Sequence, residues 1–209
     1  ITLDCSEHIH GEAAEMTDEA VAESYEPDAA IEACYLGKRF TVGDYMLTFT
    51  SELLRRTCLI YNEAIAFAVS IYRKFMKDGK ADFEISIDET SPPTLPEQHF
   101  FIANELKLQG VQPVTVAPRF IGEFQKGIDY IGELPAFERD FAVHAAIADH
   151  LGYKLSIHSG SDKFSVFPTI GQYTHGHFHL KTAGTSWLEA MAVVAEHAPA
   201  LYREIHDFI

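Results

Sequence analysis

The stretch DFEISIDE, residues 82–89, alternates apolar and polar side chains, which is the pattern of a β-strand with one apolar and one polar face. Positions 83, 85 and 87 are apolar, whereas positions 84, 86 and 88 carry Glu, Ser and Asp. A strand of a doubly wound sheet meets helices on both faces and reads as apolar throughout. The strands of a (β/α) barrel tolerate inward-facing polar residues near their C-terminal ends. The stretch therefore favours a barrel-like fold.

Strand-like and helix-like segments alternate along the rest of the chain, which predicts a mostly parallel sheet with helices outside it. The expected elements are strand 1–6, helix 44–79, strand 82–89, helix 95–110, strand 112–120, helix 135–152, strand 153–160, strand 176–184 and helix 185–209. The Gly-rich turn that marks a doubly wound nucleotide binder does not occur. Roughly five units are too few to close eight strands. We therefore expect an α/β, TIM-barrel-like single domain over residues 1–209 that is the C-terminal portion of a barrel, with the first strands absent.

The charge of the chain argues against nucleic-acid and membrane partners. Acidic residues number 31 against 16 basic ones, a formal net charge of -15, which repels phosphate backbones and anionic lipids. No apolar run is long enough to span a bilayer. Much of the acidity lies in residues 11–32, which contain no Lys or Arg. We expect an acidic insertion at about residues 11–40 that is a solvated helix or an otherwise exposed segment.

The cysteines predict a cytoplasmic protein. Cys5, Cys34 and Cys58 are odd in number and form no CxxC pair, which favours free thiols in a reducing compartment. A signal peptide is not visible either. A sheet that does not close leaves free strand edges, and these favour association with further copies of the chain into a homo-oligomer.

Four expected strand ends carry side chains that bind metals or move protons. THGHFHLKTAG at 174–184, taken as a strand, puts His175, His177, His179 and Lys181 on one face. DCSEHIHG at 4–11, SIDET at 86–90 and SIHSGSDK at 156–163 add Glu, His and Asp at the ends of other strands. Because the C-terminal strand ends of a barrel meet at one rim, we expect these groups to share a site. Two or three imidazoles with a carboxylate or water suit a divalent transition metal.

Carboxylates and cations at the same strand ends would complete a catalytic site. Two carboxylates in different surroundings can move protons in opposite directions. Lys163, Lys181 and Arg119 would compensate a carboxylate on the substrate. The alternative is that the histidines are solvated or merely hydrogen-bonded, and that Asp88 and Glu89 begin a helix or accept an ion pair. The coincidence of four such strand ends in one chain favours the site.

Four ordered strings resemble the tagaturonate epimerase family of bacterial hexuronate catabolism. They are ISIDETSPPTLPEQHFFIANEL, APRFIGEFQKGIDYIG, KLSIHSGSDKFSVFP and HLKTAGTSWLEA, and TLDCSEHI looks like the strand of that family that ends in a Glu–His pair. The resemblance implies a (β/α) barrel and an isomerase that interconverts D-tagaturonate and D-fructuronate with a divalent metal. The choice of metal among Zn, Mn, Ni, Fe and Co stays open.

The resemblance also implies a base and a set of metal ligands. Glu7 matches the proton acceptor of the family, and His8, His158 and His179 match its metal ligands. Family members carry a substantial part before the strand that TLDCSEHI resembles, and that part is absent here. We therefore expect the 209 residues alone to be inactive.

Further residues are expected to contact the sugar acid or to move the second proton. The second acid/base residue is expected in SIDET and is assigned to Glu89, with Asp88 and Glu123 as alternatives. Arg119 and Lys181 are the expected partners of the substrate carboxylate, and Asp88 is a further expected contact.

The chemistry of the two sugar acids favours retro-aldol cleavage over simple proton abstraction. They differ at the carbon β to the ketone, and enolisation acidifies only the α carbon. Cleavage between these carbons, rotation of the aldehyde and re-addition would invert the centre, with Glu7 as base. Hydride removal would need a nicotinamide, and no dinucleotide fingerprint is present. The alternatives are a metal-dependent sugar isomerase or aldolase of TIM-barrel fold and an inactive barrel fragment.

Overall fold

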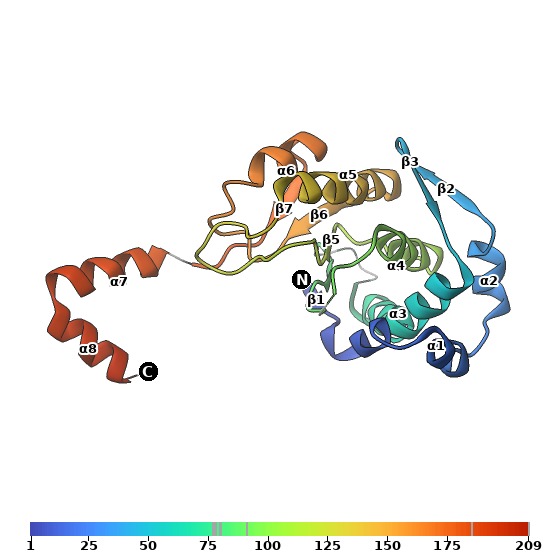
Figure 1. Ribbon diagram of the computed structural model, residues 1–209, viewed down its shortest axis with the longest axis horizontal. Helices are drawn as coiled ribbons and strands as arrows, with labels where there is room; N and C mark the ends of the chain where they lie inside the picture. Colours follow the sequence, from blue (N-terminus) through green and yellow to red (C-terminus); the bar gives the residue numbers. More distant parts are fainter. Residues whose placement is uncertain (77–78, 80, 91, 185, 209) are drawn as a thin grey trace.

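A five-stranded parallel sheet lies at the centre of the computed structural model, which describes residues 1–76, 79, 81–90, 92–184 and 186–208 (Figure 1). Its strands, neighbours in this order, are β1 (Thr2–Asp4), β4 (Glu84–Ile87), β5 (Thr115–Pro118), β6 (Lys154–Ile157) and β7 (Phe178–Leu180). All four pairings are parallel, which confirms the prediction of a parallel α/β sheet. The strand order never reverses, as it would at the switch point of a doubly wound sheet. Within the described residues the sheet stays open, and no closed barrel forms.

Four helices accompany the sheet and pack as neighbours in chain order. They are α3 (Ser51–Ile71), α4 (Pro96–Leu108), α5 (Leu134–Leu151) and α6 (Phe167–Tyr173). Local sequence sets their ends. The Thr50 hydroxyl accepts a hydrogen bond from the Leu53 N–H at the start of α3, and Gly152, with a φ of 85°, ends α5. The helices expected over 95–110 and 135–152 are confirmed at nearly these bounds.

The sheet has one apolar and one polar face, as the alternation in residues 82–89 predicts. The apolar face is buried and carries Ile85, Ile87, Val116, Leu155 and Ile157. Residues of β4 pack in one hydrophobic cluster with α3 and α4, and residues of β6 pack in a second with α5. On the polar side, the strand register pairs Glu84 with Thr2 and Thr115, and Ser156 with His179. This row of polar side chains positions the candidate site.

The acidic N-terminal segment is folded against α3 and is exposed only in part. It forms the 3₁₀ helices η1 (Ser6–His8) and η2 (Gly11–Ala14), the helices α1 (Asp18–Ser24) and α2 (Ala29–Tyr35), and the hairpin strands β2 (Arg39–Val42) and β3 (Tyr45–Thr48). Most of its carboxylates are exposed, but Val21, Tyr25 and Tyr35 are buried. Arg56 of α3 donates hydrogen bonds to three backbone carbonyls at residues 13, 14 and 16. The prediction of a solvated or exposed segment is therefore wrong for these apolar side chains, since α1 and Tyr25 pack on α3 and Tyr35 packs on Phe101 of α4.

Two expected elements have different bounds in the structure. The helix expected over 44–79 begins only at Ser51, because residues 45–48 form β3 after a turn at Gly43, and it ends in the π-helical turn η3 (Tyr72–Met76). The strand expected over 176–184 is limited to Phe178–Leu180. His175 and Gly176 have φ angles of 52° and 76° and form a left-handed turn after α6, so the expected strand face of three histidines and a lysine is wrong.

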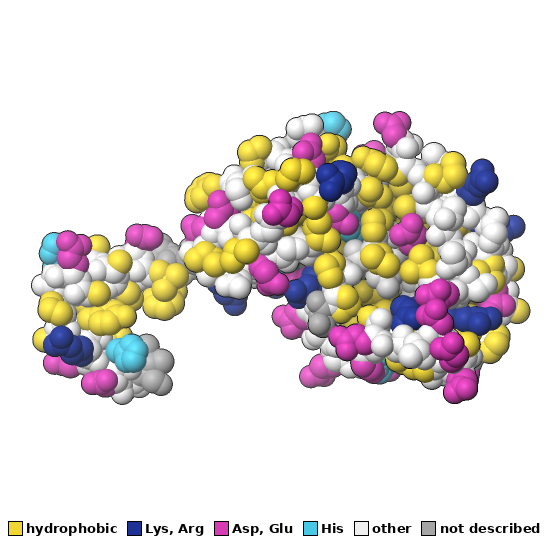
Figure 2. Space-filling model, in the orientation of Figure 1, with side chains coloured by type: hydrophobic (Ala, Val, Ile, Leu, Met, Phe, Trp, Pro, Cys, Tyr) yellow, Lys and Arg dark blue, Asp and Glu magenta, His cyan; other side chains and the backbone are white. Residues whose placement is uncertain are grey.

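The C-terminal arm, residues 186–208, projects from the body of the molecule (Figure 1). It consists of α7 (Ser186–His197) and α8 (Pro199–Phe208), which pack on each other and are separated near Pro199. No residue of α8 is buried. Figure 2 shows apolar side chains along both helices of the arm, and Trp187 and Phe208 are among the exposed ones.

The cysteines and helix lengths agree with the expectations from composition. All three cysteines are free; Cys5 and Cys58 are buried, and Cys34 is exposed. In the part of the chain that the structure describes, none of the helices combines the length and the apolar character that crossing a bilayer requires.

Candidate active site

The polar side of the sheet converges on the Glu84 carboxylate, which is 5% exposed. Its Oε1 accepts a hydrogen bond from the Thr2 hydroxyl at 3.0 Å and lies 3.1 Å from His158 Nε2. Its Oε2 accepts from the Thr115 hydroxyl at 2.7 Å and lies 2.8 Å from His179 Nδ1. Burial raises the pKa of Glu84, but hydrogen bonds from the hydroxyls of Ser156, Thr115 and Thr2 and from His158 outweigh burial and lower it to about 2. Glu84 is therefore a fixed negative charge beneath the strand ends.

His158 follows the last residue of β6 and lies between two carboxylates. Its Nε2 is 3.1 Å from Glu84 Oε1, and its Nδ1 is 3.1 Å from Asp88 Oδ1. Burial lowers the pKa of His158, but the hydrogen bonds and charges of Asp88 and Glu84 outweigh burial and raise it above its usual value. Asp88 is itself held by His158 and by the Ser86 hydroxyl. An imidazole that donates from both nitrogens is protonated and positively charged, so His158 can act as a proton donor.

His179, on β7, presents a different imidazole. Its Nδ1 lies 2.8 Å from Glu84 Oε2 and 2.8 Å from the Ser156 hydroxyl oxygen, and its side chain is 46% exposed. Because the carboxylate can only accept, Nδ1 carries the hydrogen toward Glu84. In the neutral ring the lone pair is then on Nε2, which is free to act as a ligand or base. We call Glu84, Asp88, His158 and His179 the strand-end cluster.

A cavity of about 440 Å³ opens beside the strand-end cluster. Its wall contains both acids of SIDET, and also Arg119, Glu123 and His158. Arg119 Nε is buried without a hydrogen-bond partner. The backbone N–H of Arg119 donates to the Thr94 hydroxyl at 3.1 Å. The cavity thus combines one guanidinium, several carboxylates and a histidine, which is a set of groups able to hold an acidic polyol and to exchange protons with it.

Glu7 and His8 lie in η1, directly after β1. Glu7 is exposed. His8 Nδ1 is 2.8 Å from Glu63 Oε1, and its ring packs on Phe67 with 4.0 Å between centroids. Glu63 also holds His10, whose Nε2 lies 2.8 Å from Glu63 Oε2. The structure therefore gives His8 a partner on α3 rather than on the strand-end cluster.

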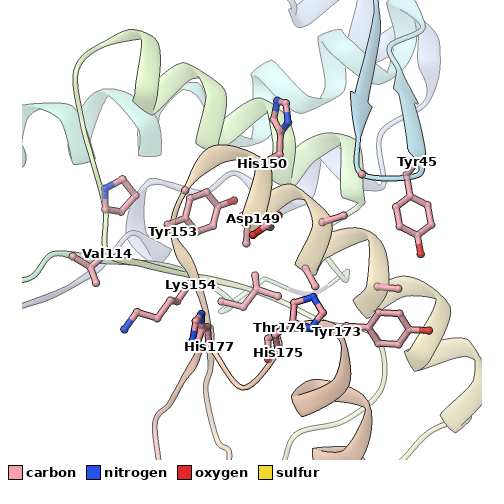
Figure 3. Close-up of a pocket in the computed structure, with 18 of the residues that line it drawn as sticks. Tyr45, Val114, Asp149, His150, Tyr153, Lys154, Tyr173, Thr174, His175 and His177 are labelled. Carbon is pink, nitrogen blue, oxygen red and sulfur yellow. The ribbon is translucent and has the colours of Figure 1, made fainter.

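The remaining candidates have separate positions. Lys181 follows β7 and is exposed. Its backbone N–H donates to the Ile157 carbonyl at 2.9 Å. Lys163 is fully buried, and its Nζ donates to three backbone carbonyls, so the suggestion that Lys163 meets the substrate carboxylate is wrong. His175 and His177 line a different cavity of about 830 Å³, next to the start of β6 (Figure 3).

Sequence reasoning missed Glu84 and a second set of histidines. Glu84 shares the polar face of DFEISIDE with Ser86 and Asp88, and that alternation was the available signal. His99 and His144 are fully buried on α4 and α5, and their Nδ1 atoms are 2.9 Å apart. Tyr153 and Asp140 extend this pair: the Tyr153 hydroxyl is 2.6 Å from His99 Nε2, and Asp140 Oδ2 is 3.6 Å from His144 Nε2. We call these four residues the helix cluster.

The side-chain types at the strand ends suit a divalent metal, because imidazole nitrogen and carboxylate oxygen are both common ligands. The three predicted ligands are not gathered at one point, since His158 and His179 share Glu84 whereas His8 contacts Glu63. Among the described residues, no group of three or more His, Cys, Asp or Glu has the arrangement of a metal site. The donor types fit a metal, and the set of ligands stays a prediction.

Comparison with known proteins finds matches over nearly the whole chain. The family model described as tagaturonate epimerase matches residues 1–209. The tagaturonate/fructuronate epimerase of Thermotoga maritima is 44% identical over 211 residues, which cover 98% of this chain and 44% of that protein. Crystal structures of the fructuronate-tagaturonate epimerase of Cohnella laeviribosi, native and with one glycerol, are 54% identical and superpose with a TM-score of 0.93. They cover 99% of this chain, which spans 44% of their length.

Proposed function

We propose, because the chain belongs to the tagaturonate epimerase family, that the protein carrying it interconverts D-tagaturonate and D-fructuronate. The matching relatives bear this activity in their names, and the chain spans 44% of their length. The observation in the chain itself that supports the proposal most is the 440 Å³ cavity, whose wall contains Arg119, acidic side chains and His158. A sugar acid needs a cation for its carboxylate and acid/base groups for its hydroxyls, and this cavity offers both.

The substrate carboxylate is proposed to bind Arg119. Arg119 Nε is buried and has no hydrogen-bond partner, so the guanidinium has donors to offer. A carboxylate can accept two parallel hydrogen bonds from such a group. Lys181, exposed just after β7, is the second candidate cation. Asp88, in the wall of the same cavity, is proposed to accept a hydrogen bond from a substrate hydroxyl.

The proposed reaction is a retro-aldol cleavage followed by aldol addition. A base removes the proton of the hydroxyl on the carbon β to the ketone, and the bond between the α and β carbons breaks. This gives an enolate and an aldehyde. The aldehyde rotates, the enolate adds to its other face, and the new alkoxide takes back a proton, so that no atoms are gained or lost. Glu7 is the proposed base, and Glu89, which lines the cavity, is the proposed second acid/base residue, with Asp88 and Glu123 as alternatives.

A divalent metal is part of the proposal. His158 and His179 would hold it, with His8 as the further ligand that the family resemblance implies, and a bound metal would polarise the substrate ketone as a Lewis acid. Metal content measured by elemental mass spectrometry after reconstitution and desalting tests this part independently of turnover. We expect about one ion per chain, with loss of the ion in the His158→Ala variant and retention in the exposed control His197→Ala.

The reaction is tested with the full-length protein and D-tagaturonate in deuterated water, followed by proton NMR. We expect D-fructuronate to form with hydrogen retained at the inverted carbon, because retro-aldol cleavage leaves that C–H bond intact. Deuterium at the inverted carbon would contradict the mechanism. A ketose whose carboxylate is replaced by CH₂OH is the matched control, and an equal rate on it would contradict the role of Arg119. Absence of any product would contradict the proposed function itself.

A further inference from the structure

Lys163 is a buried ammonium whose hydrogen bonds are all directed at backbone. The residue is fully buried, and its Nζ donates to the carbonyls of Gln125 at 2.6 Å, Ile128 at 2.6 Å and Ser161 at 2.9 Å. A lysine ammonium has three donors and no acceptor, so these three bonds use its whole capacity. Burying such a charge is costly unless every donor is satisfied, and here every donor is satisfied. The side chain is therefore unavailable to a substrate, and its role must lie in the segments it holds.

The three carbonyls belong to two loops that border the 440 Å³ cavity. Gln125 and Ile128 lie in the loop between β5 and α5, residues 119–133, which supplies Arg119 and Glu123 to the cavity. Ser161 lies in the loop between β6 and α6, residues 158–166, which supplies His158. Lys163 thus joins the segment with the cavity's cation to the segment with its histidine.

Other contacts make the longer loop a single defined conformation. The Glu123 N–H donates to the Ile131 carbonyl at 2.9 Å, and the Tyr130 hydroxyl donates to the Ile121 carbonyl at 3.2 Å. Gly122 has a φ of 82°, and a Cβ there would come within 2.2 Å of the Tyr130 hydroxyl oxygen. The Tyr130 ring therefore fills the space that any other side chain at position 122 would need. These contacts lie within the loop, whereas the Lys163 ammonium bonds to it from the neighbouring β6–α6 loop.

We propose that Lys163 is a positioning residue that holds the β5–α5 loop against the β6–α6 loop, so that Arg119 is presented to the carboxylate of the substrate. The proposal rests on the proposed function, because it assigns Arg119 the carboxylate contact. Removal of the ammonium leaves these three carbonyls, of which only that of Ser161 lies in a buried hydrogen bond, without their donor. We expect the β5–α5 loop then to shift away from the β6–α6 loop, and Arg119, its first residue, to change position toward the cavity.

A double-mutant cycle in the full-length protein tests the action through Arg119. We expect Lys163→Met to raise KM for the sugar acid by about tenfold with a smaller change in kcat, since a binding contact is lost. In the Arg119→Met background the same substitution should change KM by less than about twofold, because the contact is already gone. Equal effects of Lys163→Met in both backgrounds would overturn the proposal. Lys126→Met, an exposed lysine of the same loop, is the matched control and should leave KM unchanged.

Hydrogen exchange tests the tie between the loops without any turnover. We expect Lys163→Met to speed exchange across residues 121–131 by at least about tenfold while the amides of β4 and β5 keep their protection. Unchanged exchange in the loop would overturn the proposal, even in an active enzyme. If Lys163→Met does not fold, Lys163→Gln, which keeps two N–H donors without the charge, takes its place in both measurements. If the wild-type protein has no epimerase activity, the proposed function is contradicted. The hydrogen-exchange rates then still test whether Lys163 holds the two loops together.

Discussion

The strand-end cluster and the helix cluster contain the same kinds of side chain and have opposite electrostatics. In the strand-end cluster, His158 lies 3.1 Å from each of two carboxylates, and its pKa is raised although the residue is largely buried. In the helix cluster, His99 and His144 are fully buried and face each other, and burial lowers the pKa of both, that of His144 to about 3. Burial lowers the pKa of all three histidines, and only at His158 do two carboxylates at hydrogen-bond distance outweigh it.

This difference assigns the two clusters different roles. A charged imidazole between carboxylates beside a cavity can give up its proton, as His158 must do to bind the proposed metal. A neutral histidine pair between helices, with a tyrosine hydroxyl at one end, holds α4, α5 and the start of β6 in register. The following substitutions separate the two roles.

The largest expected effect is at the centre of the strand-end cluster. Glu84→Leu removes the acceptor for two threonine hydroxyls and two histidines and leaves a buried imidazolium with one carboxylate. We expect the free energy of unfolding, from urea denaturation at pH 7, to fall by about 4 kcal/mol. The exposed control Glu19→Leu should change it by less than about 0.5 kcal/mol. A loss below about 1 kcal/mol at Glu84 would mean that the cluster is not held by this carboxylate.

A smaller loss is expected in the helix cluster. His144→Leu leaves the buried His99 Nδ1 without its partner. Unlike Glu84→Leu, it leaves no charged imidazolium without a carboxylate partner. We expect a loss of about 3 kcal/mol in the free energy of unfolding by urea denaturation. His150→Leu, on an exposed part of the same helix, is the matched control and should be within about 0.5 kcal/mol of wild type. A loss equal to or greater than that of Glu84→Leu would reverse the comparison.

Asp140 allows the charge within the helix cluster to be changed without removing atoms. Burial raises the pKa of Asp140 from 3.8 to about 6, so the folded state binds its proton more tightly than the unfolded state does. The resulting stability is fully present below about pH 4 and is lost as the pH rises through 6. Asp140→Asn keeps an oxygen to accept from the Ile121 N–H and removes the buried charge. We expect it to raise the free energy of unfolding at pH 7 by about 2 kcal/mol.

The pH profile of the same variant carries a second signature. The pKa of His144 is lowered to about 3, so the unfolded state binds its proton first and stability falls as the pH drops from about 6.5 toward 3. In the wild type, protonation of Asp140 opposes this fall between pH 6 and 4. In Asp140→Asn only the histidine contribution remains. Melting temperatures measured from pH 8 to pH 4 should therefore fall more steeply in the variant, and parallel profiles would show that Asp140 stays ionised in the folded protein.

The fold was predictable where local signals agree with one another. Pro96 and Gly110 bracket α4, and alternation defines β4 and β6, so the parallel sheet follows from the sequence alone. Prediction failed at residues 45–48, because a hairpin strand directly before a long amphipathic helix continues its apolar pattern. It failed again at His175, because α6 uses the chain up to that point and a left-handed turn must precede β7.

The residues of the candidate site at the strand ends were predictable from the sequence, and the buried residues beneath them were not. Asp88, Glu89, Arg119 and His158 border one cavity, as residues at neighbouring strand ends should. Glu84 was missed, because only the three-dimensional register brings the first residue of β4 under His158 and His179. The sequence likewise does not show that Lys163, just after the turn at Gly160, is fully buried, since its burial depends on two loops that meet only in the folded chain.

The smallest expected effect on stability is at His179, and it separates holding the fold from holding a ligand. The His179 side chain is 46% exposed and makes one hydrogen bond to Glu84, which keeps its threonine, serine and His158 donors when that bond is lost. His179→Gln should therefore change the free energy of unfolding by less than about 1 kcal/mol. The proposed role of the free Nε2 as a metal ligand nevertheless predicts that the bound ion is lost from the full-length protein, as read by elemental mass spectrometry. His177→Gln, two residues away on the wall of the larger cavity, should keep the ion. Loss of stability with the ion retained would show that His179 stabilises the fold and that other residues bind the metal.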